Sequence, residues 1–306
     1  MSDDATAEAG VDTDTATTDA DAETTAAATA PADAPPTPAT LLLDGPAMRQ
    51  WAVDAVAQAV DDGVLSVERV VINDEVAESL DGDRLATLRR YVDTARDYGP
   101  WAVVSAYHNV LDTPDHLRWV PLDDLPWADA ERVPCTPEPA ESFGQVLPED
   151  VVDDIAADTD VVLRFGFGII KGDVLTEPKY GVLSFHHGDL RRYRGRPVGA
   201  WEFLEGADQA GVTLQRLTET LDGGAVVKLW TTDISDADTW REVERRLFAV
   251  STGMLSAGLA SLRAGEEPTT LPSDDLGALY TDPDARETAR FLAKNAVGSV
   301  RGLLGR

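Results

Sequence analysis

The stretch YGVLSFHHGDLRRYRGRP, residues 180–197, joins an apolar run to two adjacent histidines and then to a block of arginines. The chain has only four histidines, so a pair at the end of an expected strand marks a candidate site. Side chains alternate between the two faces of a strand, which places Ser184 and His186 on one face and His187 on the other. Gly188 permits the chain to turn directly after the pair.

Working outward from this stretch, apolar runs that predict strands alternate with segments of helical spacing. The expected strands lie at residues 40–44, 67–74, 101–107, 160–170, 180–187, 211–217 and 225–234. The expected helices lie at residues 45–60, 84–98 and 238–262. This alternation predicts an α/β fold, a mostly parallel sheet with helices on both faces. No G-x-G-x-x-G follows the first strand, so the sequence gives no reason to expect a dinucleotide.

Three segments differ in composition from the rest of the chain. Residues 1–39 are rich in Ala, Thr, Asp and Pro and are expected to form a disordered acidic tail. Residues 109–150 carry many Pro and Asp and are expected to form a surface excursion. A domain at 40–264 is then followed by an extension at 265–306, which ends in a basic amphipathic helix. That helix either meets a partner or an anionic surface, or docks on its own acidic domain, and we favour docking.

The charge balance limits the partners of the chain. It has 55 acidic against 26 basic residues, a formal net charge of −29, which on average repels nucleic acid and anionic membranes. Such a surface resembles those of proteins from salt-loving microbes. The longest uncharged apolar run, residues 247–262, is too short for a membrane span, and no signal peptide is visible, so we expect a cytoplasmic protein. The single cysteine, Cys135, excludes an internal disulfide and is expected to be a packed thiol.

Several motifs follow one another in an order that is familiar from one family. The strand ending at His186 is followed by YRG at 193–195, GVT at 211–213 and LDGG at 221–224. With FGFGII upstream, residues 161–227 resemble the catalytic half of the folate-dependent formyltransferases. That family includes glycinamide ribonucleotide, methionyl-tRNA and nucleotide-sugar formyltransferases and formyltetrahydrofolate hydrolases.

The resemblance implies a Rossmann-like formyltransferase fold and 10-formyltetrahydrofolate as the formyl donor. It implies catalytic roles for His186 and Asp222, with Ser184 at the position of a third catalytic residue. It implies a folate contact for two loops, made of Phe167, Gly168, Ile169, Ile170, Gly223 and Gly224. It implies an acceptor contact for Tyr193, Arg194 and Gly195.

The sequence departs from the family pattern beside the histidine. The family has Asn two residues before the His, where this chain has Ser184, and Pro directly after it, where this chain has His187. Because that Asn donates a hydrogen bond to the oxyanion, three outcomes are open: Ser184 works through a water, His187 supplies the donor, or transfer has been lost and binding kept. Asn109, near the end of an expected strand, is a further candidate donor.

Plainer interpretations stand beside the functional ones. Asp222 suits an ordinary turn before two glycines, and FGFGII suits a buried strand and turn. A metal site from His186, His187 and Asp189 is disfavoured, because adjacent residues rarely converge on one ion. The arginines that follow form either a phosphate site or a solvated loop. These residues are Arg191, Arg192, Arg194 and Arg196.

These observations predict a 10-formyltetrahydrofolate-dependent N-formyltransferase that acts on the amine of a small acceptor, such as an amino-sugar nucleotide. The chain after Trp230 has too few expected strands for an RNA-binding barrel, which argues against nucleic acid. The alternatives are a non-catalytic folate-binding relative, a formyltetrahydrofolate hydrolase and an enzyme like the methionyl-tRNA formyltransferases. The sequence leaves the acceptor and the oligomeric state open.

Overall fold

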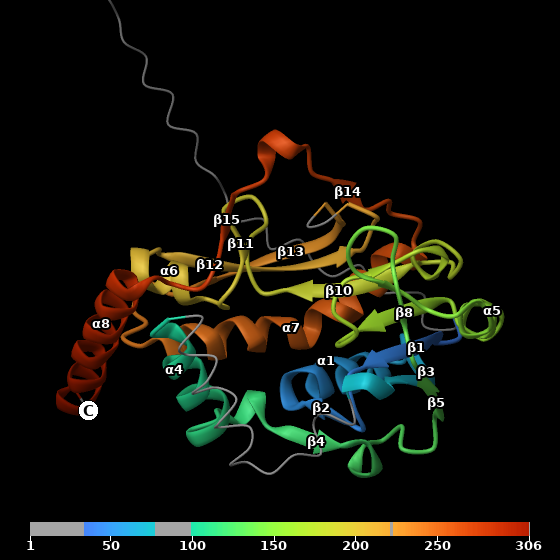
Figure 1. The fold of residues 1–306 in the computed structure, drawn as a ribbon, viewed down its shortest axis with the longest axis horizontal. Coiled ribbons are helices and arrows are strands. Elements are labelled where there is room, and N and C mark those ends of the chain that lie inside the picture. Colours follow the sequence, from blue (N-terminus) through green and yellow to red (C-terminus); the bar gives the residue numbers. More distant parts are fainter. Residues whose placement is uncertain (1–33, 77–98, 221–222, 306) are drawn as a thin grey trace, which may run out of the picture.

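A computed structural model describes residues 34–76, 99–220 and 223–305. Its centre is an eight-stranded sheet in the order β14-β13-β12-β10-β8-β1-β3-β5 (Figure 1). The strands of this sheet are β1 (Thr37–Leu43), β3 (Leu65–Asn73), β5 (Glu131–Cys135), β8 (Val161–Arg164), β10 (Val182–His186), β12 (Gln209–Arg216), β13 (Ala225–Asp233) and β14 (Thr269–Thr270). Five neighbouring strands, from β10 to β5, pair in parallel, and β12 to β14 extend the sheet antiparallel. The expected α/β fold with a mostly parallel sheet is confirmed.

Helices cover both faces of this sheet. The long helix α7 (Trp240–Arg263) packs against α1 (Gln50–Asp61) and against β12 and β13 on one face. On the opposite face, the shorter α5 (Glu149–Asp158) buries Val152 and Ile155 in a second apolar cluster. The parallel strands read as continuous apolar runs because both of their faces are covered. Each face therefore has its own core, and the sheet lies between them.

The remaining strands form three small sheets at the surface. They are β2 (Ala47–Arg49) with β4 (Trp119–Pro121), β6 (Glu138–Pro139) with β7 (Gln145–Val146) and β9 (Ile170–Lys171), and β11 (Tyr193–Gly195) with β15 (Ala278–Tyr280). The last helices are the short α4 (Trp101–Ala106) and α6 (Ala200–Glu205), and the C-terminal α8 (Ala285–Leu304). The expected helix at 84–98 lies outside the described residues.

One expected strand was wrong. Residues 101–107 begin a helix, α4, in which Trp101, Ala102 and Ala106 are buried while Val103 is exposed. A run of apolar residues does not by itself distinguish a strand from a short buried helix. The strand beside β3 is instead β5, which lies within the segment at 109–150 that was expected to be a surface excursion. Its two charged residues and its proline, in the sequence ERVPC, suit a strand at the edge of the sheet.

The other expected elements in the described residues are confirmed, with shifted ends. The first strand begins at Thr37, so the last three residues assigned to the acidic tail form part of the sheet. The long helix begins after Thr239, whose side chain accepts from the Glu242 amide, and Gly265 follows its end with a φ of 82°. Cys135 is buried, and burial raises the pKa of its thiol to about 11, as suits a packed, unreactive thiol.

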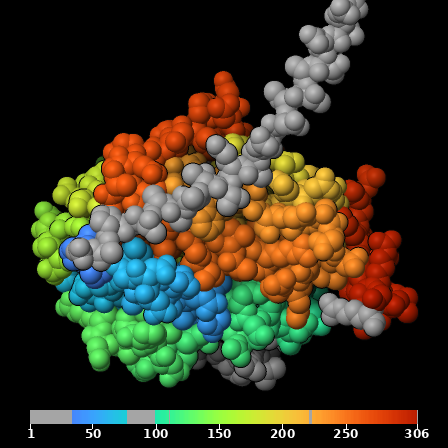
Figure 2. All heavy atoms as spheres, turned by 180° about the vertical axis from the view of Figure 1, so that it is seen from behind, coloured from blue at the N-terminus to red at the C-terminus, as the bar shows by residue number. Residues whose placement is uncertain are grey.

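The C-terminal helix α8 lies at one end of the molecule (Figures 1 and 2). Asp284 and Glu287 form a capping box at its start. Phe291 is buried against Trp101 and Trp240, and the Asn295 side chain accepts from the Trp240 amide. One face of the basic helix is therefore docked on the domain, as favoured from the sequence. Among the described residues, no helix is both long and apolar enough to cross a membrane.

Candidate active site

The candidate site lies at the carboxyl ends of the parallel strands, where β1, β8 and β10 run side by side. In open α/β sheets this edge is where ligands bind, close to the point at which the strand order reverses. Parallel pairing puts Ser184 of β10 opposite Arg164 of β8. Antiparallel pairing on the other side puts Ser184 opposite Gln215 and His186 opposite Thr213 of β12. Neighbouring strands thus bring polar side chains together at one edge.

The expected orientation of the two histidines agrees with their contacts. His187 packs against α1 and α7: its ring lies 4.7 Å from that of Trp51 and 4.2 Å from that of Phe248. Its Nε2 lies 2.9 Å from the Ser251 hydroxyl. Burial, and then the charges of His186 and His116, lower the pKa of His187 to about 3. His187 is therefore neutral at ordinary pH and faces away from Ser184.

Ser184 is buried, and its hydroxyl accepts a hydrogen bond from Arg164 Nη1 at 2.9 Å. The Arg164 Nε also donates to the carbonyl of Gly168 at 2.7 Å. Burial lowers the pKa of Arg164, and the Asp44 carboxylate opposes this shift. An arginine stays protonated in a protein even so. The Ser184 hydroxyl therefore lies beside a fixed positive charge.

His186 is partly buried, and its Nε2 lies 3.2 Å from the carbonyl of Tyr193. A carbonyl only accepts, so the ring donates from Nε2, and a neutral imidazole then has Nδ1 as its acceptor. A side chain at Gly188 would meet both the Tyr193 carbonyl and the His186 ring, with closest approaches of 2.6 and 2.8 Å. The turn after the two histidines therefore requires a glycine. Because the chain turns back at Gly188, the Tyr193 carbonyl reaches the His186 ring and orients it.

The first of the two loops assigned to folate follows β8. Phe167 is fully buried with a φ of 65°, its amide donates to Asp44 Oδ1 at 2.6 Å, and its carbonyl accepts from Gln145 Nε2 at 2.7 Å. Gly168 and Ile169 are exposed, whereas Ile170 is buried in β9. The surface of this loop is thus Gly168 and Ile169, held from beneath by Phe167. The folate contact remains a prediction.

The second loop, LDGG, contains Asp222, which lies outside the described residues. Gly224 is buried beside the Gln215 side chain, and a Cβ on Gly224 would lie 2.6 Å from Gln215 Oε1. That oxygen is buried and has no hydrogen-bond partner among the described residues. A buried polar atom without a hydrogen-bond partner is uncommon in folded proteins. The Gln215 oxygen, which lies between Gly224 and Ser184, is therefore able to accept a hydrogen bond.

The residues assigned to the acceptor form β11, which pairs with β15. The Tyr193 hydroxyl donates to Glu205 at 2.8 Å, and Arg194 Nε donates to the carbonyl of Gly277 at 2.8 Å. Burial and the Glu205 hydrogen bond raise the pKa of Tyr193. Gly195 has a φ of 94°, which favours glycine. The structure uses the three residues to tie this loop to β15, and their contact with an acceptor stays a prediction.

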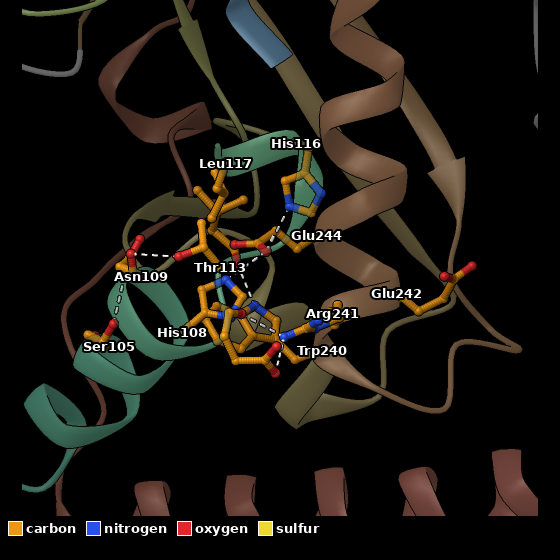
Figure 3. Close-up of polar contacts among 12 residues, drawn as sticks. Ser105, His108, Asn109, Thr113, His116, Leu117, Trp240, Arg241, Glu242 and Glu244 are labelled. Carbon is orange, nitrogen blue, oxygen red and sulfur yellow. Dashed lines mark hydrogen bonds and ion pairs between the residues drawn. The ribbon is translucent and has the colours of Figure 1, made fainter. Parts of the chain in front are cut away.

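Sequence reasoning missed a buried network between α7 and the helical turn that follows α4 (Figure 3). Glu244 Oε2 lies 2.8 Å from His108 Nε2 and 2.9 Å from His116 Nε2. Burial would raise the pKa of Glu244, but the hydrogen bonds from the two histidines outweigh it and lower the pKa. Asn109 belongs to this region and donates to the Ser105 carbonyl, so it does not end a strand as expected. No spacing in the sequence joins His108 to Glu244, so no local signal predicts the network.

Three of the four arginines after the histidines are bonded to groups of the protein itself. Arg191 is bound to the buried Asp189 through its Nε and its Nη2, at 3.0 and 2.9 Å. Arg196 lies 3.6 Å from Asp282, while Arg194 holds a carbonyl. Within the part of the chain that the structure describes, no group of three His, Cys, Asp or Glu side chains is arranged to hold a metal ion.

Comparison with known proteins confirms the resemblance seen in the sequence. Residues 134–257 match the model of the family described as formyl transferase. The chain is 28% identical to the methionyl-tRNA formyltransferase of Cutibacterium acnes over 156 residues, which is 50% of this chain and 49% of that protein. It is 32% identical to the enzyme of the same name from Fusobacterium nucleatum over 127 residues, 41% of this chain and 40% of that protein. The chain thus spans about half the length, or less, of these curated relatives.

Among solved structures, glycinamide ribonucleotide transformylase 1 from Symbiobacterium toebii superimposes with a TM-score of 0.49 and 16% identity, covering 78% of this chain and 95% of that one. The match to the formyl transferase family includes β8, β10 and β12, and with them Arg164, Ser184 and His186. The family resemblance therefore covers the edge of the sheet at which the polar side chains meet.

Proposed function

We propose that this chain transfers a formyl group from 10-formyltetrahydrofolate to the amine of a small acceptor. The observation that carries the proposal is the placement of His186, which lies at the carboxyl end of β10. It falls within the residues that match the formyl transferase family. Its ring is oriented by the Tyr193 carbonyl at 3.2 Å. Ser184 is two residues earlier on the same strand, beside the guanidinium of Arg164. A proton carrier and a hydrogen-bond donor thus lie together at one edge.

Formyl transfer needs both of these groups. The acceptor nitrogen attacks the formyl carbon, a new C–N bond forms, and the carbonyl oxygen becomes an oxyanion. The C–N bond to the folate then breaks, the acceptor nitrogen loses a proton and the leaving nitrogen gains one. An imidazole can donate to the oxyanion and carry the proton near neutral pH, and this is the role we assign to His186. By resemblance, Asp222 assists it.

A small acceptor is favoured by the charge of the chain. The formal net charge of −29 works against a polyanion, because the repulsion acts over the whole surface. Methionyl-tRNA is a second candidate acceptor, supported by the names of the curated relatives. Those relatives match this chain over half of its length or less, so the match supports the formyl-transfer chemistry more than the acceptor.

The test follows the release of tetrahydrofolate from 10-formyltetrahydrofolate by absorbance, with separate reactions for each acceptor. The acceptors are amino-sugar nucleotides, glycinamide ribonucleotide and methionyl-tRNA. Turnover that depends on one acceptor supports a transferase and identifies the acceptor class. Turnover with no acceptor present would instead indicate a hydrolase. Tight donor binding without any turnover would indicate a non-catalytic relative.

A further inference from the structure

The neighbour of Ser184 determines which hydrogen bonds its hydroxyl can make. The Ser184 side chain is 3% exposed, and its hydroxyl accepts from Arg164 Nη1 at 2.9 Å. A guanidinium has donors only, so Arg164 occupies a lone pair of the hydroxyl and leaves the hydroxyl proton to be donated elsewhere. Among the described residues, no hydrogen bond takes up that proton. The hydroxyl is therefore poised to donate.

Arg164 is itself held on two sides. Its Nε donates to the Gly168 carbonyl at 2.7 Å, which ties it to the loop that follows β8. The Asp44 carboxylate lies at the end of the next strand and accepts from the Phe167 amide at 2.6 Å, which fixes the same loop. The parallel register between β8 and β10 pairs Arg164 with Ser184. The position of the guanidinium is therefore set by Ser184 of the neighbouring strand and by the loop that follows β8.

His187, the alternative donor considered from the sequence, is ruled out by the direction of its side chain. His187 lies on the opposite face, packed between Trp51 and Phe248 and bonded to Ser251. Asn109 lies in the helical turn Tyr107–Leu111 that follows α4, and its side chain donates to the Ser105 carbonyl. Of the donors considered from the sequence, only the Ser184 hydroxyl remains on the same face as His186.

We propose that Arg164 is a positioning residue that makes the Ser184 hydroxyl the hydrogen-bond donor to the formyl oxygen. This inference rests on the proposed function. A hydroxyl that accepts from a cation becomes a stronger donor, because hydrogen bonds in a chain polarise one another. The nearby charge also stabilises the oxyanion through the low-dielectric interior. Arg164 and Ser184 therefore act as a unit.

The experiment measures kcat and the KM for 10-formyltetrahydrofolate with the best acceptor. The variants are Arg164→Met, Arg164→Lys, Ser184→Ala and the double variant Arg164→Met/Ser184→Ala. Loss of one oxyanion donor lowers kcat about 10²–10³-fold, and we expect this for Arg164→Met and for Ser184→Ala. Because the two residues act as a unit, the double variant should lose little more than either single variant. Arg164→Lys, which keeps the charge and one donor, should recover part of kcat.

The matched control is Arg216→Met, which removes an arginine from β12 that pairs only with Glu267 at 3.7 Å among the described ion pairs. Its kcat should stay within a few-fold of the wild-type value. Losses that multiply in the double variant, or an Arg164→Met variant with wild-type kcat, would overturn the inference alone. A wild-type protein without turnover for any acceptor would overturn the proposed function and this inference together. Thermal unfolding of each variant separates misfolding from the loss of a donor.

Discussion

At the end of β10, the two faces of the sheet differ in the side chains that they carry: one is polar and the other is aromatic. On one face, which we call the polar face, Ser184 and His186 lie beside a guanidinium and a backbone carbonyl. On the other face, His187 is enclosed by aromatic rings from α1 and α7. Two adjacent histidines therefore have different environments, and the difference arises from strand alternation. Sequence neighbours in a strand share an environment far less than residues two apart do.

The largest expected effect is on the polar face. Replacing His186 by Ala should lower turnover about 10²–10⁴-fold, the usual contribution of a positioned acid or base. Donor affinity should change much less, because the side chain acts on the reacting group. The measurement is steady-state kinetics together with calorimetric titration of the donor. Equal turnover in the variant would remove His186 from the mechanism.

On the aromatic side of the sheet, the network of Glu244, His108 and His116 should carry the next largest effect, on stability. The His116 ring of this network packs on Phe248. Glu244→Gln should lower the free energy of unfolding by about 1.5–3 kcal/mol, because it removes the buried carboxylate that accepts hydrogen bonds from His108 and His116. The pKa of Glu244 is lowered in the folded state, so its contribution is present above the ordinary value near 4.5 and is lost as the pH falls through the folded value. Urea unfolding at pH 7 and pH 4 measures both. A stability equal to wild type at pH 7 would contradict the network's role.

His187 should give the protein a pH dependence of its own. Its pKa is lowered from 6.5 to about 3, so folding favours the neutral ring. The stability it contributes is present above pH 6.5 and is lost as the pH falls from 6.5 to about 3. The slope should reach at most about 1.4 kcal/mol per pH unit. His187→Phe should flatten that slope, and an unchanged slope would place the titration in another group.

The smallest expected effect concerns Gln215 on the polar face. Gln215→Met removes a buried oxygen that has no partner in the described structure, so the free energy of unfolding should rise by about 0–1 kcal/mol. Donor affinity should fall, if the amide binds the donor beside the LDGG loop. Thermal unfolding and donor titration on the same sample separate the two. A destabilised variant would show that the amide has a structural partner instead.

The sequence predicts that Ser184 and His186 share one face of the strand, because the alternation of side chains along a strand is a local signal. The position of β5 and the helical state of residues 101–106 depend on which strand pairs with β3, and an apolar run does not encode that choice. The partners of Ser184 and Glu244 were also missed. Arg164 is 20 residues from Ser184 and His108 is 136 residues from Glu244 along the chain, so only the folded sheet and helices bring them together.

The most direct test compares His186→Ala with His187→Phe in one assay. Tetrahydrofolate release is measured with the acceptor that supports wild-type turnover, and donor binding is measured in parallel. We predict that His186→Ala binds the donor but loses turnover by at least about 10²-fold, while His187→Phe stays within a few-fold of wild type. Equal losses in the two variants, or none in His186→Ala, would contradict the assignment of the polar face as the site of formyl transfer.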